Sequence, residues 1–177
     1  MTRIVAIGDS ITWGYPDGYS WTALTAEALD VEIRNMGING DTLEGMQYRL
    51  QEDVIDRKPD LALVMGGSND VFQGFAPDEI RDIALEIRGR LEENGIRPVF
   101  GVPIPILMSD LHAKLEVFRE WLRNEAHPVI PFDQAFMNES GIRAGLLPDG
   151  VHPTHEGYRL MADVAVAALR KILKGDA

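Results

Sequence analysis

Four short clusters of small and polar residues carry the side chains best suited to chemistry. They are Gly8–Thr12, Asn35–Thr42, Gly66–Asp70 and Asp149–Thr154. Together they supply a serine hydroxyl, glycine-flanked backbone amides, a carboxamide and an Asp/His pair. Acyl transfer needs such a set, because a serine attacks a carbonyl only when an adjacent base removes its proton.

The residue types suggest a role for each member of the set. Ser10 can act as the nucleophile and His152 as its base, with Asp149 orienting the imidazole from three residues earlier. The backbone N–H groups of Ser10 and Gly40 and the side-chain amide of Asn69 can form an oxyanion hole. Losing one such donor typically slows acyl transfer by about 10²–10³-fold.

Simpler structural roles compete with these assignments. A lone serine after a strand is most often a turn residue or a helix N-cap, and Asn69 and Gly40 can equally serve only in turns. Among the nearby carboxylates, Asp41 fits a helix N-cap, and Asp9 fits an acceptor of backbone hydrogen bonds. Asp70 fits the same description as Asp9, so we assign none of the three carboxylates a chemical role.

Other catalytic templates do not fit this chain. His152 and His155 form an H-x-x-H pair near Asp149, but three turn residues without a fourth ligand are a poor zinc template, so we expect no metal. The chain has no cysteine, which excludes thiolate chemistry. The sequence also contains no P-loop motif, no G-x-G-x-x-G after its first apolar run and no G-x-S-x-G elbow.

Five short runs predict β-strands. Four are almost continuously apolar, as parallel strands buried on both faces must be, and the fifth alternates as an edge strand does. The continuous runs are Ile4–Ile7, Leu61–Met65, Val99–Val102 and Val129–Ile130, and the alternating run is Val31–Arg34. The alternating run is therefore expected at an edge of the sheet.

Helical periodicity fills the intervals between these runs. Apolar residues recur at helical spacing over 80–91, 43–54 and 111–122, and over a last segment that starts near Thr154. Pro77 is placed to begin the first of these helices. The alternation predicts a doubly wound parallel sheet with five strands and about five helices. Ligands of such sheets bind beyond the carboxyl ends of the strands, where the four polar clusters lie.

Composition limits the remaining function classes. The 177 residues form one expected domain, 1–177, and carry 17 basic and 28 acidic side chains, a formal charge of −11. That balance argues against a nucleic-acid surface and against a polybasic membrane anchor. No apolar run approaches the roughly 18 residues of a membrane span, and the start Met1–Ile7 is not a signal peptide. As written, the protein is expected in the cytoplasm.

The four clusters also carry a family resemblance. Gly8–Thr12, Gly40, Gly67–Asp70 and Asp149–Pro153 resemble, in that order, the four sequence blocks of the SGNH (GDSL-type) hydrolases. The resemblance extends from the first apolar run to the final helix, and is greatest to the bacterial thioesterase I/lysophospholipase/arylesterase branch. That branch is usually exported behind a signal peptide, and we expect none here from the residues Met1–Ile7. Ile11 stands where the family name has leucine.

The resemblance implies a fold and a set of roles. The fold is a three-layer α/β/α, flavodoxin-like one, whose five-stranded parallel sheet has the order 2-1-3-4-5. Ser10, Asp149 and His152 are implied as the catalytic triad. Ser10, Gly40 and Asn69 are implied as the oxyanion hole.

A pocket for the substrate is expected at the same edge of the sheet. Apolar residues follow the strand ends and can line it, although such residues also often only close a core. They are Trp13, Tyr15, Phe72, Phe75 and Ile104–Met108. Of these we assign Phe72 and Ile106 to substrate binding.

The predicted function is that of a serine hydrolase that cleaves carboxylic esters or thioesters through an acyl-enzyme. Small acyl or aryl esters, lysophospholipids and acyl-CoA are the candidate substrates, and no cofactor is expected. Two alternatives stay open: a carbohydrate O-acetylesterase of the same fold, and a catalytically silent binding module. The expected partner is a small-molecule substrate, without nucleic acid or a membrane anchor, and the oligomeric state is not readable from the sequence.

Overall fold

A five-stranded parallel sheet forms the centre of the protein, as seen in a computed structural model that describes residues 2–126 and 128–175. Its strand order is β2-β1-β3-β4-β5, which confirms the expected order and places the alternating run at an edge. The strands are β1 (Arg3–Gly8), β2 (Glu32–Gly37), β3 (Leu61–Met65), β4 (Arg97–Gly101) and β5 (Val129–Ile130).

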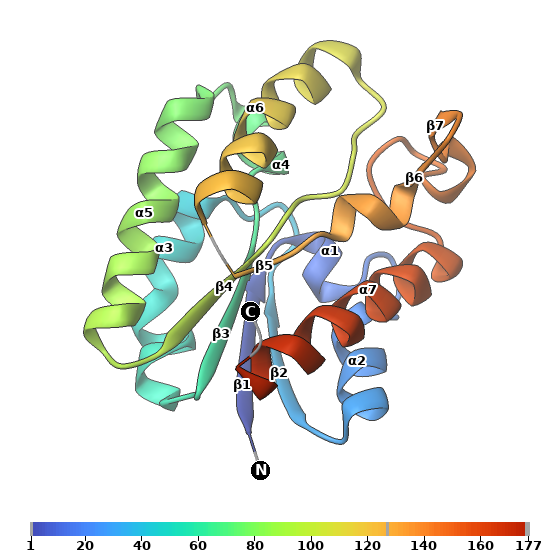
Figure 1. Ribbon diagram of the computed structural model, residues 1–177. Coiled ribbons are helices and arrows are strands. Elements are labelled where there is room, and N and C mark those ends of the chain that lie inside the picture. Colours follow the sequence, from blue (N-terminus) through green and yellow to red (C-terminus); the bar gives the residue numbers. More distant parts are fainter. Residues whose placement is uncertain (1, 127, 176–177) are drawn as a thin grey trace.

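Helices cover both faces of the sheet and complete the predicted three-layer α/β/α fold. In Figure 1, α3 and α5 lie on one side of the strands and α2 and α7 on the other. The helices are α1 (Ser10–Trp13), α2 (Trp21–Leu29), α3 (Leu43–Asp53), α4 (Ser68–Gln73), α5 (Pro77–Glu93), α6 (Ser109–Glu125) and α7 (His155–Lys174).

Two apolar clusters join the layers, one on each face of the sheet. Successive side chains of a strand point to opposite faces. Val5 and Ile7 of β1 therefore pack with α3, α5 and α6, whereas Ile4 and Ala6 pack with α2 and α7. This double burial explains why the inner strands are almost continuously apolar.

The elements that the sequence did not predict are short or depend on tertiary contacts. Helices α1 and α4 have four and six residues, too few to show an apolar period. Two further short strands, β6 (Met137–Asn138) and β7 (Gly141–Ile142), form a small antiparallel hairpin. They lie in the stretch between β5 and α7, which holds mainly 3-10 turns.

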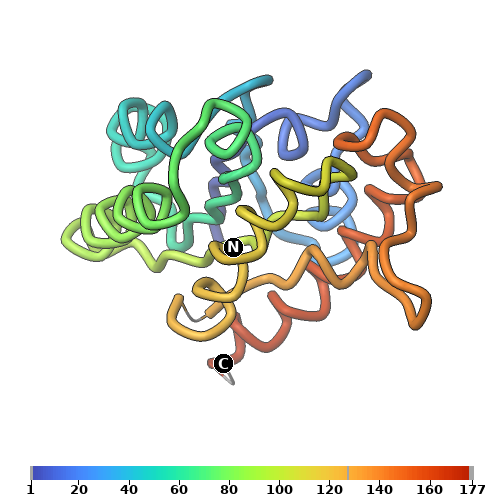
Figure 2. The backbone as a smooth tube through the Cα atoms, turned by 90° about the horizontal axis from the view of Figure 1, so that it is seen from above, coloured from blue at the N-terminus to red at the C-terminus, as the bar shows by residue number. Residues whose placement is uncertain are grey.

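The pairing of the three strands β2, β1 and β3 fixes where their loops begin. Gly8 at the end of β1 pairs with Gly37 of β2 and with Met65 of β3. Because the strands are parallel, the segments that follow them leave from one edge of the sheet. Figure 2, a view from above, shows the segment after β1 running beside the orange chain that leads into α7.

Asp9 fastens the turn between β1 and α1. It is the N-cap of α1, and its side chain accepts a hydrogen bond of 2.9 Å from the Ile11 N–H, as expected of a structural carboxylate. Burial raises the pKa of Asp9 to about 7. The hydrogen bond from the Ile11 N–H lowers this pKa, and the nearby carboxylates of Asp70 and Asp41 raise it further. The folded protein therefore binds a proton here that the unfolded chain has already released.

This difference predicts a dependence of stability on pH. Between about pH 4 and pH 7 only the unfolded chain loses the Asp9 proton. As the pH rises through this range, the free energy of unfolding should therefore fall by up to about 1.4 kcal/mol per pH unit. Asp9→Asn keeps an oxygen for the Ile11 N–H and should remove this part of the slope. Urea denaturation at several pH values measures it, with Asp163→Asn on the exposed face of α7 as control. Equal slopes in wild type and Asp9→Asn would contradict the prediction.

Candidate active site

Ser10 lies on a tight turn between a strand and a helix. It is the first residue of α1 and is 7% exposed. A Cβ atom on Gly8 would lie 2.1 Å from the Thr12 hydroxyl and 2.9 Å from the Met65 carbonyl oxygen, so the turn needs glycine there. The absence of a side chain lets the chain bend sharply enough to bring the Ser10 hydroxyl to the edge of the sheet.

The predicted base and its carboxylate partner lie in line with this hydroxyl. The Oγ of Ser10 is 3.0 Å from Nε2 of His152, and Nδ1 of the same ring is 2.7 Å from Oδ2 of Asp149. The side chains of His152 and Asp149 are 24% and 49% exposed, respectively. The three residues proposed from the sequence are thus brought into one hydrogen-bonded chain.

The loop that carries His152 is shaped by Asp149 itself. Oδ1 of Asp149 accepts the N–H groups of Val151 and His152 at 2.9 and 2.7 Å. Burial acts to raise the pKa of Asp149, but the backbone and ring N–H groups of His152 outweigh it and hold this pKa below its usual range. The carboxylate is therefore ionised near neutral pH, and it can only accept hydrogen bonds. A neutral imidazole ring in this position carries its one proton on Nδ1, which leaves the lone pair of Nε2 facing Ser10.

The three expected oxyanion donors come from the ends of β1, β2 and β3. Gly40 has a φ of +78°, and a Cβ atom there would meet open space. Within residues 2–126 and 128–175, the backbone N–H groups of Ser10 and Gly40 have no hydrogen-bond acceptor. The Asn69 amide donates to the Asp41 carbonyl at 2.8 Å, which fixes its orientation. Two free donors and one fixed amide therefore follow three neighbouring strands.

A network of charged side chains holds the segments that follow β1 and β2. Its central residue, Arg49, was not predicted from the sequence. The Arg49 guanidinium of α3 bonds to the Asp41 and Asp53 carboxylates and donates to the Gly8 carbonyl at 3.1 Å. Nothing in the periodicity of α3 connects Arg49 with the first strand. Its i,i+4 spacing to Asp53 was the one readable signal, and it indicates only an ordinary helical ion pair.

Asp70 accepts backbone hydrogen bonds near the site, as the sequence interpretation expected. The Asp70 carboxylate accepts the N–H groups of Leu43 at 3.0 Å and Gly67 at 3.1 Å. Burial raises the pKa of Asp70 to about 6, although these N–H groups lower it. Asp41 is not itself the N-cap of α3, because the neighbouring Thr42 hydroxyl accepts the Gly45 N–H. Asp41 instead pairs with Arg49.

The apolar residues after the strand ends divide into two groups. Trp13, Tyr15 and Phe72 are between 37% and 41% exposed, so Phe72 is open to solvent as a substrate contact would be. Ile106 is 1% exposed and packs in the core, which corrects its assignment to a substrate surface. The chain before α6 is held to that helix by Arg119, which donates to the Ile104 carbonyl at 2.8 Å.

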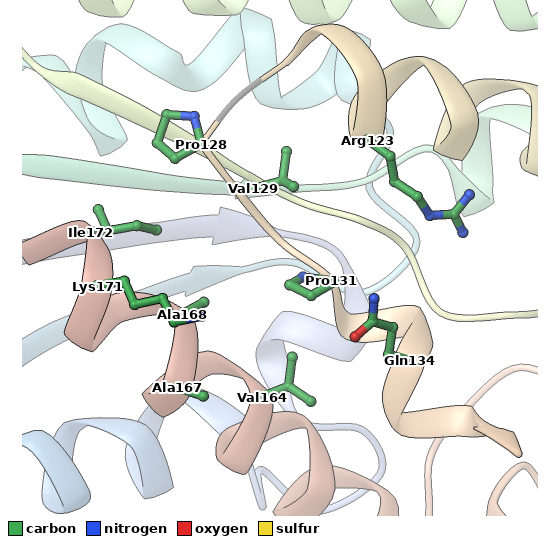
Figure 3. Close-up of a pocket in the computed structure, with 10 residues that line it drawn as sticks. All are labelled: Arg123, Pro128, Val129, Pro131, Gln134, Val164, Ala167, Ala168, Lys171 and Ile172. Atoms are coloured by element: carbon green, nitrogen blue, oxygen red, sulfur yellow. The ribbon is translucent and has the colours of Figure 1, made fainter. Parts of the chain in front are cut away.

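A hollow of about 650 Å³ lies away from these residues. It opens between β5 and α7 and is lined by Arg123, Val129, Pro131, Ala168 and Lys171 among others (Figure 3). It contains none of the predicted site residues.

His155 lies apart from the triad, because its Nε2 is 2.9 Å from the Asp17 carboxylate. No cluster of three metal-ligating side chains occurs among the described residues.

In the described part of the chain, no helix has both the length and the apolar character needed to cross a bilayer. The expected cytoplasmic location stays a prediction.

Several known proteins are similar to this chain in sequence or in structure. An arylesterase of Vibrio mimicus is 26% identical over 97% of this chain and 90% of its own. The lipoprotein YqeF of Bacillus subtilis is 33% identical over 59% of this chain, a match that spans about half (49%) of that protein. A solved structure of a lipolytic G-D-S-L protein from Desulfitobacterium hafniense superposes with a TM-score of 0.86, at 26% identity, over 95% of this chain and 99% of its own.

A family model describes the region that holds all four polar clusters. The model of the GDSL-like lipase/acylhydrolase family matches residues 6–160, which include Ser10, Gly40, Asn69, Asp149 and His152. This match confirms the resemblance stated from the four blocks, and the sheet order agrees with it. The chain therefore belongs to the GDSL-like lipase/acylhydrolase family, a family of ester hydrolases.

Proposed function

We propose that this protein hydrolyses carboxylic esters or thioesters of small acyl or aryl groups through a covalent intermediate on Ser10. The observation that carries the proposal is the hydrogen-bonded chain from the Ser10 hydroxyl through His152 to Asp149. A serine becomes a useful nucleophile only when a base of this kind lies within hydrogen-bond reach. The family assignment supports the same chemistry, and the arylesterase relative suggests aryl esters as the first substrates to try.

In the proposed reaction, each residue moves or holds a proton at a defined atom. Ser10 Oγ attacks the carbonyl carbon while Nε2 of His152 takes the hydroxyl proton. The ionised Asp149 stabilises the imidazolium that results. His152 then gives the proton to the leaving alcohol or thiol, which departs and leaves an acyl group on Ser10. Water repeats the sequence, with its proton taken by His152, and releases the carboxylic acid.

The oxyanion formed in both steps needs donors that are already oriented. The free N–H groups of Ser10 and Gly40 and the Asn69 amide meet this need from three different strand ends. Such donors stabilise charge most when they require no rearrangement during the reaction. The Asp41 carbonyl, which accepts one hydrogen of the Asn69 amide, leaves the other hydrogen for the substrate.

Substrate size distinguishes the main proposal from the carbohydrate O-acetylesterase. A series of p-nitrophenyl esters from acetate to longer chains, together with acyl-CoA thioesters, compares kcat/KM across acyl groups. Trp13 and Phe72, on the short helices that also carry Ser10 and Asn69, have part-exposed rings, and such rings favour acceptance of chains beyond acetyl. Strict preference for acetyl over butyryl would instead support the deacetylase.

The nucleophile is tested by Ser10→Ala. Because no other group then receives the acyl chain, kcat for p-nitrophenyl acetate should fall by about 10⁴–10⁶-fold. A fluorophosphonate, which reacts with an activated serine, should label the wild type and leave Ser10→Ala unlabelled. Hydrolysis at an unchanged rate in Ser10→Ala would remove Ser10 from the mechanism, and an unlabelled wild type would support the silent binding module.

The oxyanion hole is tested by Asn69→Ala. We expect kcat to fall by about 10²–10³-fold while KM changes little, because the donor acts mainly on the transition state. Asn94→Ala is a suitable control, since Asn94 also donates to a backbone carbonyl but lies at the far end of α5. If Asn69 only stabilises its turn, the substitution will lower the melting temperature and leave kcat of the folded protein near the wild-type value.

A further inference from the structure

The imidazole ring of His152 packs against an aromatic ring. The ring of Tyr15 lies against it, with the two ring centroids 4.3 Å apart and the planes tilted by 36°. His152 is carried by a loop, and its two ring nitrogens are bound only along the plane of the ring. The Ser10 and Asp149 hydrogen bonds thus lie in the plane of the imidazole, whereas Tyr15 packs against its face.

Tyr15 is itself held to the nucleophile. Its backbone N–H donates to the Ser10 carbonyl at 3.0 Å, and the preceding Gly14 N–H donates to the same oxygen at 2.9 Å. Gly14 has a φ of +95°, and a Cβ atom there would lie 2.9 Å from backbone atoms of Gly18 and Tyr19. The turn that presents Tyr15 is thus closely packed and begins directly at the residue that carries the reactive hydroxyl.

A second contact fixes Tyr15 from helix α7. The Tyr158 hydroxyl of α7 donates to the Tyr15 carbonyl at 3.0 Å, and Tyr158 is fully buried. Burial, together with the charges of Asp9, Asp149 and Asp17, raises the pKa of Tyr158, so its hydroxyl keeps the proton that it donates. Tyr15 is consequently bound at its N–H to the nucleophile and at its carbonyl to the helix that follows the base.

We propose that Tyr15 is a positioning residue, which orients the His152 ring toward Ser10 and stabilises the imidazolium formed during the reaction. This inference rests on the proposed function, because it acts through the proposed base. The electron-rich face of a phenol attracts a cation, so the contact is stronger with the imidazolium than with neutral imidazole. The contact therefore favours the transition state over the resting enzyme, which is the condition for an effect on kcat.

The protein contains a matched pair for comparison. Tyr19 lies against His155 with the same centroid distance of 4.3 Å and a similar tilt of 32°. His155 bonds to Asp17 rather than to the reactive serine. Removing the Tyr19 ring therefore removes the same kind of contact from a histidine outside the proposed machinery.

The test compares Tyr15→Leu, Tyr15→Phe and Tyr19→Leu by steady-state hydrolysis of p-nitrophenyl acetate. Tyr15→Leu should lower kcat by about 3- to 30-fold with little change in KM, and should slow fluorophosphonate labelling by a similar factor. Tyr15→Phe keeps the ring and should stay within about twofold of wild type, as should Tyr19→Leu. Rescue by phenylalanine identifies the ring, and not the hydroxyl, as the active part.

Three outcomes would overturn the proposal. Tyr15→Leu with wild-type kcat means that the contact does not act in the reaction, and a raised KM at unchanged kcat makes Tyr15 a substrate contact. Equal losses in Tyr15→Leu and Tyr19→Leu mean a general disturbance of the loop. Thermal unfolding of each variant confirms that it is folded. Should Tyr15→Leu not fold, Tyr158→Phe removes only the hydroxyl that holds Tyr15, and it should lower kcat by about 2- to 10-fold; an unchanged kcat then overturns the proposal.

The two proposals fail in different ways. If the wild type is labelled at Ser10 and Tyr15→Leu is labelled equally fast, only the role of Tyr15 is lost. If the wild type is not labelled and Ser10→Ala hydrolyses the ester as fast as wild type, the proposed function itself is lost.

Discussion

The parallel pairing of β1 with β2 on one side and β3 on the other is the constraint on which the site depends. This pairing places Gly8, Gly37 and Met65 side by side, and each is followed within a few residues by one of the proposed oxyanion donors. The backbone passes so close to its neighbours here that glycine is needed: a Cβ atom on Gly37 would lie 2.2 Å from the backbone nitrogen of Trp13. Gly8 and Gly37 therefore serve the close packing of the chain at this edge of the sheet, whereas Gly40, where a Cβ atom would meet open space, does not.

Strand pairing brings these segments together, and partly buried charged side chains fix their shapes. Arg49 connects the Gly8 carbonyl to the Asp41 carboxylate, and the carbonyl of Asp41 orients the Asn69 amide. Asp70 connects the loop of Asn69 to the start of α3 through Leu43. Removing one partner from such a network leaves another polar group buried without a partner, which typically costs several kcal/mol. The shape of the site and the stability of the fold are thus coupled through the same few side chains.

Much of the fold was readable from the sequence because the relevant signals are local. Double burial makes strands such as Leu61–Met65 continuously apolar, and α5 shows its apolar stripe and its N-terminal proline directly. The grouping of Ser10 with Gly40 and Asn69 followed from the rule on strand ends. The assignment of Ile106 failed because the same rule does not say which side chains of an extended segment turn inward. The role of Arg49 depends on a contact across 41 residues, and no local pattern reports it.

The two halves of the proposed machinery are anchored by different physical means. The serine and the oxyanion donors sit at strand ends, within hydrogen-bond networks that extend into the core. His152 instead comes from a loop, where the half-exposed Asp149 carboxylate determines the turn. A base must pass its proton between two atoms, so its ring needs a fixed plane and little else. A carboxylate at one nitrogen and an aromatic ring on one face provide that plane, without the deep burial that would penalise the imidazolium.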